Sequence, residues 1–259
     1  MTEPLVRYDY RPPAVLLTID RPDKRNALNR DLIAALTAAF ERARDDSAAS
    51  CVLLTGAGPA FCAGMDLAEL SATIDADRAT IWNDAVNLAR LLDLIYTLSK
   101  PTIAVVNGAA VAGGAGLMTV CDLALAVPTA KFGYPEVRRG LVAAMVMPHL
   151  LRHVGERVAR WLLLAGELID AAMALRVGLI NEVVPTDQLL PTADRWANSL
   201  AEGGPNALAS TKEMLRQFSR QALSVEEAAG ASAAPRLTEE CRAGLRAFFD
   251  KRPAPWTKP

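Results

Sequence analysis

Asn107–Asp122 reads N-G-A-A-V-A-G-G-A-G-L-M-T-V-C-D, and the other segments of the chain are best interpreted around it. An extended apolar segment, Thr102–Val106, comes directly before it. Its glycines Gly113, Gly114 and Gly116 stand close together and are followed by residues typical of a buried helix. A strand, a glycine-rich turn and a helix start leave backbone N–H groups unobstructed by side chains. Such a turn can hold an anion, or the oxyanion of an activated carbonyl.

A second glycine-bearing turn, Phe61–Asp66 (F-C-A-G-M-D), follows the strand-like run Cys51–Thr55. One carboxylate, Glu136, lies later in the chain in the apolar setting of residues 132–137. Two N–H donors from separate turns can polarise a carbonyl and stabilise an enolate, while one carboxylate moves a proton at the adjacent carbon. A plainer interpretation also stands at this point: the glycines permit close packing of helix on strand, and most glutamates are solvated surface groups.

Composition and charge narrow the class of protein. The chain has 259 residues, half of them apolar and only 5% aromatic, which suits a packed α/β core with a terminal helical extension. The formal net charge of −1 gives no field that would recruit nucleic acid or a membrane surface. The start of the chain lacks a basic segment followed by an apolar one, so we expect a cytoplasmic protein.

One charge-free run, 102–121, is long enough to span a bilayer. Its glycines and Asn107 interrupt it, and its first part is β-branched. A buried strand, turn and helix explain the run better, and we expect no membrane span.

No metal site is expected. The four cysteines lie far apart without a C-x-x-C pair. His149 and His153 stand four residues apart on a predicted helix, a spacing that could bind a metal, but no H-E-x-x-H glutamate and no third ligand accompany them. A partly buried structural role is the better interpretation of both histidines.

Strands and helices alternate along the chain, which predicts an α/β fold built of repeated ββα units. Predicted strands cover residues 6–10, 15–19, 51–55, 102–106, 123–127, 130–132 and, as an extended segment, 179–184. Predicted helices cover residues 29–44 with Asn29 as N-cap, 79–98, 147–153, 156–164, 171–177 and most of the remainder. We expect residues 69–78 to form a polar, mobile stretch. The tail 236–259 is predicted to be a helix whose apolar Leu245, Phe248 and Phe249 pack on a neighbouring subunit.

The order and sequence of several motifs resemble those of the enoyl-CoA hydratase/isomerase (crotonase) family, over essentially the whole chain. The matching segments are Arg21–Asn29 (R-P-D-K-R-N-A-L-N), Phe61–Leu67 (F-C-A-G-M-D-L), Lys100–Gly108 (K-P-T-I-A-V-V-N-G), Gly113-Gly114 with Cys121-Asp122, Phe132-Gly133 with Pro135-Glu136, and Phe249–Pro253 (F-D-K-R-P).

The resemblance implies a crotonase-like spiral of ββα units over residues 1–195. Residues 196–259 would form a C-terminal helical region that builds homo-trimers or hexamers. It implies an acyl-CoA thioester substrate and no separate cofactor, since CoA is part of the substrate. By position, the Met65 and Gly113 amides would form the oxyanion hole and Glu136 would carry the acid–base chemistry. The residues implied to bind substrate or CoA are Lys24, Arg25, Ala27, Ala63, Gly64, Asp66, Leu67, Gly114 and, toward a neighbouring subunit, Lys251. On its own, the basic pair Lys24-Arg25 is compatible either with phosphate binding or with a solvated loop.

One departure from the family pattern affects the expected activity. Hydratases of this family usually carry an earlier catalytic glutamate three residues after the position of Gly113, and this chain has Gly116 there. Residues 140–144 also replace the usual proline–glycine pair. The pattern of residues 113–117 followed by residues 136–142 is similar to that of bacterial branched-chain enoyl-CoA hydratases of the methylglutaconyl-CoA type. Three functions therefore stay open: an enoyl-CoA hydratase, a single-glutamate Δ3-Δ2-enoyl-CoA isomerase, or a CoA-thioester-binding member of the family without hydratase activity.

Overall fold

The computed structural model describes residues 4–219, 224–253 and 255, and its main feature is a six-stranded sheet with the strand order β1-β2-β3-β5-β7-β10. Its strands are β1 (Val6–Arg11), β2 (Ala14–Ile19), β3 (Cys51–Gly56), β5 (Thr102–Val106), β7 (Leu123–Ala126) and β10 (Glu182–Val183). The β1–β2 hairpin is antiparallel and the other neighbours are parallel. Strands β2, β3 and β5 are buried along their length, which explains their continuous apolar sequence.

A smaller sheet carries the candidate site. Its order is β4-β6-β8-β9, with β4 (Ala60–Cys62), β6 (Ala109–Val111) and β8 (Lys131–Gly133) parallel and β9 (Ile169–Asp170) antiparallel to β8. Strands β4, β6 and β8 each follow a strand of the large sheet after a short turn, from β3, β5 and β7 respectively. This arrangement confirms the predicted ββα repeat.

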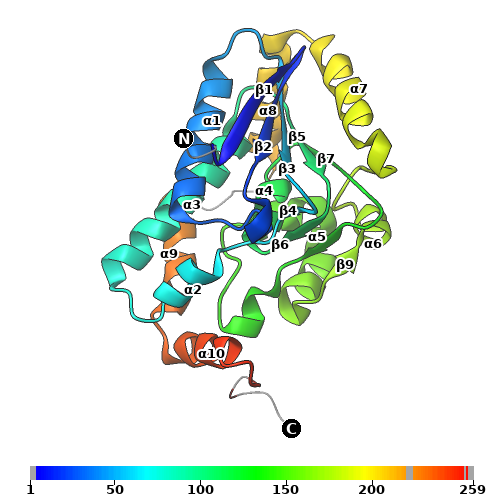
Figure 1. Cartoon of the computed structure of the whole chain (residues 1–259). Helices are drawn as coiled ribbons and strands as arrows, with labels where there is room; N and C mark the ends of the chain where they lie inside the picture. The colour runs from blue at the N-terminus through cyan, green and yellow to red at the C-terminus, as the bar shows by residue number, and fades with distance from the viewer. Residues whose placement is uncertain (1–3, 220–223, 254, 256–259) are drawn as a thin grey trace.

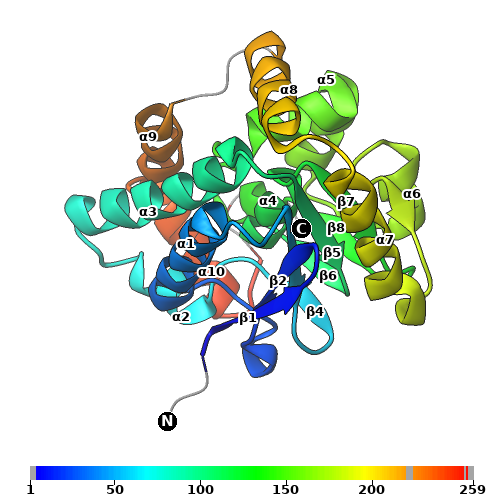
Figure 2. The same cartoon turned by 90° about the horizontal axis from the view of Figure 1, so that it is seen from above.

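Helices cover both sides of the large sheet, with α1 and α3 on one side and α7 on the other (Figure 2). They are α1 (Arg30–Asp45), α2 (Leu67–Ala72), α3 (Arg78–Thr97), α4 (Gly113–Thr119), α5 (Met147–Ala165), α6 (Ala171–Arg176), α7 (Leu189–Ala201), α8 (Pro205–Phe218), α9 (Val225–Arg236) and α10 (Glu239–Phe249). Three short 3₁₀ helices are η1 (Pro22–Lys24), η2 (Pro135–Arg139) and η3 (Thr186–Gln188). The predicted cap is confirmed at α1, where the Asn29 side chain accepts a hydrogen bond from the Leu32 N–H at 3.0 Å.

The charge-free run 102–121 folds as β5, β6 and α4, which confirms its interpretation as a buried strand, turn and helix. Among the described residues, no helix combines the length and apolar character that crossing a bilayer requires.

Three local predictions have different outcomes. Residues 67–72, assigned mostly to a mobile polar stretch, form α2, so that prediction is wrong; the Asp66 side chain caps the helix by accepting from the Ala68 N–H at 2.9 Å. The two helices predicted over 147–153 and 156–164 are confirmed, because the backbone of α5 is non-helical at Gly155, where φ is +69°. Within the predicted extended segment 179–184, residues 182–183 form β10, and the N–H groups of Asn181 and Val184 also donate to carbonyls of β7.

The C-terminal helices fold back over the chain's own core. Helix α9 lies along α3, and α10 packs against α9, α2 and η2 at one end of the molecule (Figure 1). Leu245 is buried there in a cluster with Leu70 and Cys241. The prediction that Leu245 needs a neighbouring subunit to cover it is therefore wrong. Phe248 stays partly exposed, with the Arg139 guanidinium carbon 4.3 Å from its ring centre.

Candidate active site

The two glycine-bearing turns meet because β4 and β6 are parallel neighbours, so both strands end at the same edge of the small sheet. Residues 63–66 follow β4, and Ala112 leads from β6 into α4. The contact between them requires glycine. A Cβ on Gly114 would lie 2.1 Å from the Cys62 carbonyl oxygen, and a Cβ on Gly64, whose φ is +91°, would lie 2.8 Å from the Val111 carbonyl oxygen. The packing interpretation of these two glycines is therefore confirmed.

Two backbone amides stand unpaired at this junction. Leu28 and Met65 form an isolated β-bridge. In this bridge the Asp66 N–H donates to the Leu28 carbonyl at 2.7 Å, whereas the Met65 N–H takes no part. Gly113 is the first residue of α4, so its N–H has no intrahelical acceptor. Neither amide donates a backbone hydrogen bond to any residue in the described part of the chain. The Gly113 Cβ position would be 4.0 Å from the Gly64 Cα, which places the two turns side by side.

Ala112 holds a strained conformation between these turns, with φ +51° and ψ −123°. Its N–H donates to the Gly133 carbonyl at 2.8 Å, and its carbonyl accepts from the Gly116 N–H at 2.9 Å. A non-glycine residue in such a region costs about 1–3 kcal/mol and persists only where its surroundings fix it. The strain lies directly before the Gly113 amide, so the two hydrogen bonds also fix the direction of that N–H.

Glu136 comes from the next strand of the same sheet, since η2 follows β8. Its Oε2 is buried and has no hydrogen-bond partner in the described structure. Burial raises the pKa of the Glu136 carboxyl to about 7, opposed by its own backbone N–H and by the nearby Arg139. The direction of this pKa shift fits the apolar setting of residues 132–137 noted in the sequence. Within that segment, Phe132 and Tyr134 are fully buried whereas Val137 is exposed.

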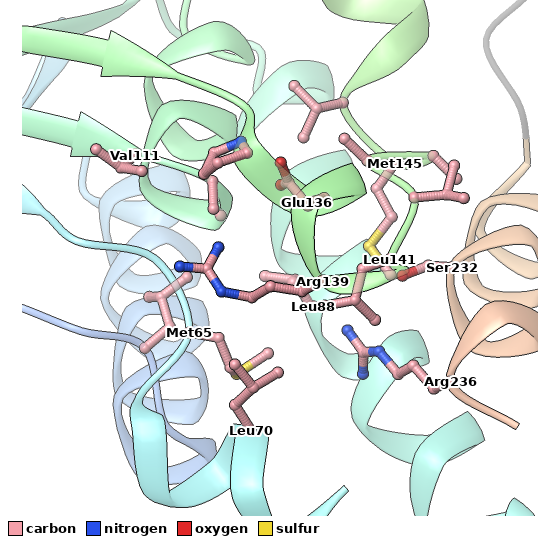
Figure 3. Close-up of a pocket in the computed structure, with 18 of the residues that line it drawn as sticks. Met65, Leu70, Leu88, Val111, Glu136, Arg139, Leu141, Met145, Ser232 and Arg236 are labelled. Carbon is pink, nitrogen blue, oxygen red and sulfur yellow. The ribbon is translucent and has the colours of Figure 1, made fainter. Parts of the chain in front are cut away.

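Met65, Gly113 and Glu136 line one pocket, whose cavity volume is about 150 Å³. Figure 3 shows Glu136 and Arg139 entering it from η2 and Arg236 entering it from α9. Most of the wall is apolar, and the apolar side chains are Leu28, Ala63, Leu67, Leu70, Leu88, Leu92, Val111, Ala112, Pro135, Leu141, Val142, Ala143, Ala144, Met145 and Val146. Among the described residues that line it, Glu136 is the one carboxylate.

The position of the missing family glutamate is filled. A Cβ on Gly116 would lie 2.8 Å from Val146 Cγ2, so any side chain there requires Val146 to move. Val146 lies two residues after the segment 140–144, which also departs from the family pattern.

The residues predicted to contact CoA lie around the first turn. Lys24 and Arg25 are exposed on the loop of η1, and the Arg25 carbonyl accepts from the Ala63 N–H at 3.0 Å. Leu67 is exposed at the pocket edge, and Ala63 and Gly64 form the turn itself.

Other predicted residues have different surroundings. Ala27 and Gly114 are buried, Gly114 beneath Cys62. The Asp66 carboxylate pairs with Arg21 at 3.0 Å as well as capping α2, so its side chain is already engaged. Lys251 is exposed after α10 and does not line the pocket.

The histidines have contacts within the fold. His149 is buried, its ring centre 4.4 Å from that of Tyr96, and burial lowers its pKa to about 4. His153 Nε2 lies 2.8 Å from the Thr119 carbonyl oxygen. Within the described residues, no three histidine, cysteine or acidic side chains gather as a metal site would need.

The sequence did not indicate two pocket residues, Arg139 and Arg236. Arg139 stands three residues after Glu136 on a 3₁₀ helix, where such residues eclipse one another, so that spacing was a usable signal once η2 was recognised. Arg236 lies a hundred residues downstream on α9, and nothing local marks it as a pocket residue.

Comparison with known proteins shows the family of the chain. The profile of the family described as enoyl-CoA hydratase/isomerase matches residues 13–259. A 2,3-dehydroadipyl-CoA hydratase from Escherichia coli is 36% identical over 260 residues, covering 97% of each chain. A crotonyl-CoA hydratase from Syntrophomonas wolfei is 34% identical over 245 residues, covering 92% of each. The crystal structure of an enoyl-CoA hydratase/isomerase from Mycobacterium paratuberculosis superposes with a TM-score of 0.86 at 28% identity, over 94% of this chain and 98% of that one. The chain belongs to the enoyl-CoA hydratase/isomerase family, with its crotonase fold.

Proposed function

We propose that this protein is an enoyl-CoA hydratase, which adds water reversibly to a 2-enoyl-CoA thioester. The observation that carries the proposal is the meeting of two unpaired amides, on Met65 and Gly113, with one buried carboxyl of raised pKa, Glu136, in a single pocket. Relatives named as hydratases support the same reaction.

The amides would act on the thioester carbonyl. With its oxygen between the Met65 and Gly113 N–H groups, the carbonyl draws electrons from the conjugated double bond, which makes the β-carbon electrophilic and stabilises the enolate. Donors of this kind are typically worth about 10²–10³ in rate each. Their rigid positions, held by Gly64, Gly114 and Ala112, keep them in place before the substrate arrives.

Glu136 would supply the proton. Its protonated carboxyl gives a proton to the α-carbon while the oxygen of a water molecule bonds to the β-carbon. The surplus proton of that water returns to the carboxylate, so the carboxyl is regenerated and one water has been added. A pKa of about 7 leaves protonated and ionised forms both accessible near neutral pH, as acid–base catalysis requires.

One observation favours a second function. Among the described residues that line the pocket, Glu136 is the single carboxylate. Isomerisation of a 3-enoyl to a 2-enoyl thioester needs only one group, which moves a proton between the C2 and C4 carbons. Val146 occupies the space beside Gly116, so a second acid at that position would require Val146 to move. The same two amides would stabilise the dienolate.

The CoA part of the substrate is proposed to lie along residues 63–67, with Lys24 and Arg25 near its phosphates. The exposure of these two cations and the hydrogen bond from Ala63 to the Arg25 carbonyl support this placement. The proposed reaction uses no cofactor besides the CoA that the substrate carries. A cytoplasmic location stays a prediction.

Replacing Glu136 with Gln should reduce hydration of crotonyl-CoA by at least about 10², because the amide keeps the size of the side chain but cannot exchange the proton. Binding of the thioester, measured by calorimetry, should stay near that of the unmodified protein. Glu202→Gln, at an exposed position beyond α7, is the matched control. Retention of most of the activity by Glu136→Gln would contradict the mechanism.

Assaying 3-enoyl-CoA isomerisation beside hydration separates the two candidate functions. If the unmodified protein binds the thioesters but catalyses neither reaction, it is a non-catalytic member of the family.

The raised pKa of Glu136 should also appear in protein stability. Its carboxyl keeps its proton in the native state up to about pH 7 but loses it near pH 4.5 in the unfolded chain. Its contribution to the free energy of unfolding is therefore fully present below about pH 4.5 and is lost as the pH rises through 7. At pH 8, Glu136→Gln should be more stable than the unmodified protein by about 2–3 kcal/mol, allowing for partial solvent exposure. At pH 5 the two should be close. Chemical denaturation at both pH values measures the difference, and an equal difference at both would rule out this origin.

We also propose that the protein is a homo-trimer or hexamer. The support comes from apolar side chains left exposed on helices α5 and α8, namely Leu164 at 70%, Leu215 at 65% and Phe218 at 81%. Light scattering at micromolar concentration should give a trimer or hexamer mass, and Leu215→Glu should lower it. A monomer mass for the unmodified protein would refute the proposal.

A further inference from the structure

Two arginines line the pocket, one carried by η2 and the other by α9. Arg139 shares η2 with Glu136, and the eclipsed spacing of a 3₁₀ helix directs both side chains to the same side. Arg236 is the last residue of α9, and Ser232, one turn earlier on the same helix face, also lines the pocket. Figure 3 shows the Arg236 guanidinium directed toward the pocket interior, near Leu141 and Leu88.

Neither arginine has an acidic partner among the described residues. The ion pairs of the described chain include neither of them, and the Nε of each is buried without an acceptor. The acid whose charge acts on Arg236 is Asp84, and that carboxylate is already held by Arg30 through two hydrogen bonds of 2.7 and 2.8 Å.

Glu136 does not balance these charges. It acts electrostatically on Arg139 but forms no ion pair with it, and burial keeps much of the Glu136 carboxyl protonated near neutral pH. Arg139 is otherwise covered by the ring of Phe248. The ionisable groups lining the described pocket are therefore one partly protonated acid and two cations.

Two cations without a paired anion are costly in free energy inside a pocket, unless a ligand supplies the missing negative charge. A guanidinium removed from water without a partner is strongly disfavoured, and replacing it with an apolar residue would usually be neutral or stabilising. An arginine is best satisfied by a carboxylate, which accepts two parallel hydrogen bonds from its planar fork. The apolar wall formed by Leu88, Leu92 and Met145 suits the methylene groups between a thioester and such a carboxylate.

We propose that the acyl group of the substrate ends in a second carboxylate, which binds Arg236 with Arg139 beside it. The inference rests on the proposed function, because it places the thioester at the Met65 and Gly113 amides. The preferred substrate is then an ω-carboxy-2-enoyl-CoA rather than one that ends in a methyl group.

The test compares two thioesters of equal carbon number, 5-carboxypent-2-enoyl-CoA and hex-2-enoyl-CoA. The unmodified protein should have the higher kcat/KM for the carboxylated thioester. Arg236→Met should lower that value by about 10- to 100-fold, as expected for a charge-assisted pair, and should change the value for hex-2-enoyl-CoA much less. Arg236→Lys keeps the charge and should recover part of the loss.

The matched control is Arg242→Met. Arg242 also has a buried Nε without an acceptor, but it pairs with Glu239 on α10 and does not line the pocket. This variant should leave the ratio of the two kcat/KM values unchanged. Equal losses on both thioesters in Arg236→Met, together with a lower melting temperature, would show a structural role and overturn the proposal.

A binding measurement separates this inference from the proposed reaction. In the Glu136→Gln background, calorimetry should show adipyl-CoA binding more tightly than hexanoyl-CoA by about tenfold or more, and Arg236→Met should abolish the difference. If hex-2-enoyl-CoA is hydrated but adipyl-CoA binds no better than hexanoyl-CoA, the inference fails and the hydratase function stands. If the binding preference is present but neither enoyl thioester is hydrated, the inference stands and the proposed function fails.

Discussion

The close contact between Gly114 and the Cys62 carbonyl oxygen is the constraint on which the site depends. It allows β4 and β6 to end side by side, so that the turn after each strand directs an unpaired N–H toward one pocket. Any larger residue at either Gly64 or Gly114 would separate the strands and with them the Met65 and Gly113 amides. The large sheet, the hairpin at its edge and the covering helices serve to hold this small sheet rigid.

The third strand of the same sheet positions the carboxylate of the site. Strand β8 leads into η2, and Glu136 on η2 lines the same pocket as Met65 and Gly113. Its burial lowers stability above neutral pH but gives its carboxyl a pKa suited to proton transfer. Helix α10 packs against η2, and Gly140 lies so close to Cys241 that a Cβ would be 2.9 Å from its Cα. The C-terminal region thus supports the acid directly, and α9 adds Arg236 to the same pocket.

The sequence predicted those parts of the molecule that local patterns determine. The N-cap at Asn29, the buried strands and the glycine turns all followed from residues close together in the chain. The resemblance to a known family added the roles of Met65, Gly113 and Glu136. Contacts between distant segments were not predictable in this way. Leu245 is covered by α2 of its own chain, and Val146 fills the space beside Gly116. Similarly, Arg236 lines the same pocket as Glu136, which lies a hundred residues earlier in the chain.

In the proposed reaction, the Met65 and Gly113 amides polarise the thioester carbonyl. Infrared difference spectroscopy of crotonyl-CoA labelled with ¹³C at that carbonyl, bound to the Glu136→Gln protein, tests this polarisation most directly. We expect the C=O stretching frequency of the bound thioester to fall below its value in water, because two fixed donors withdraw electron density from the bond. A frequency equal to or above that in water would contradict it.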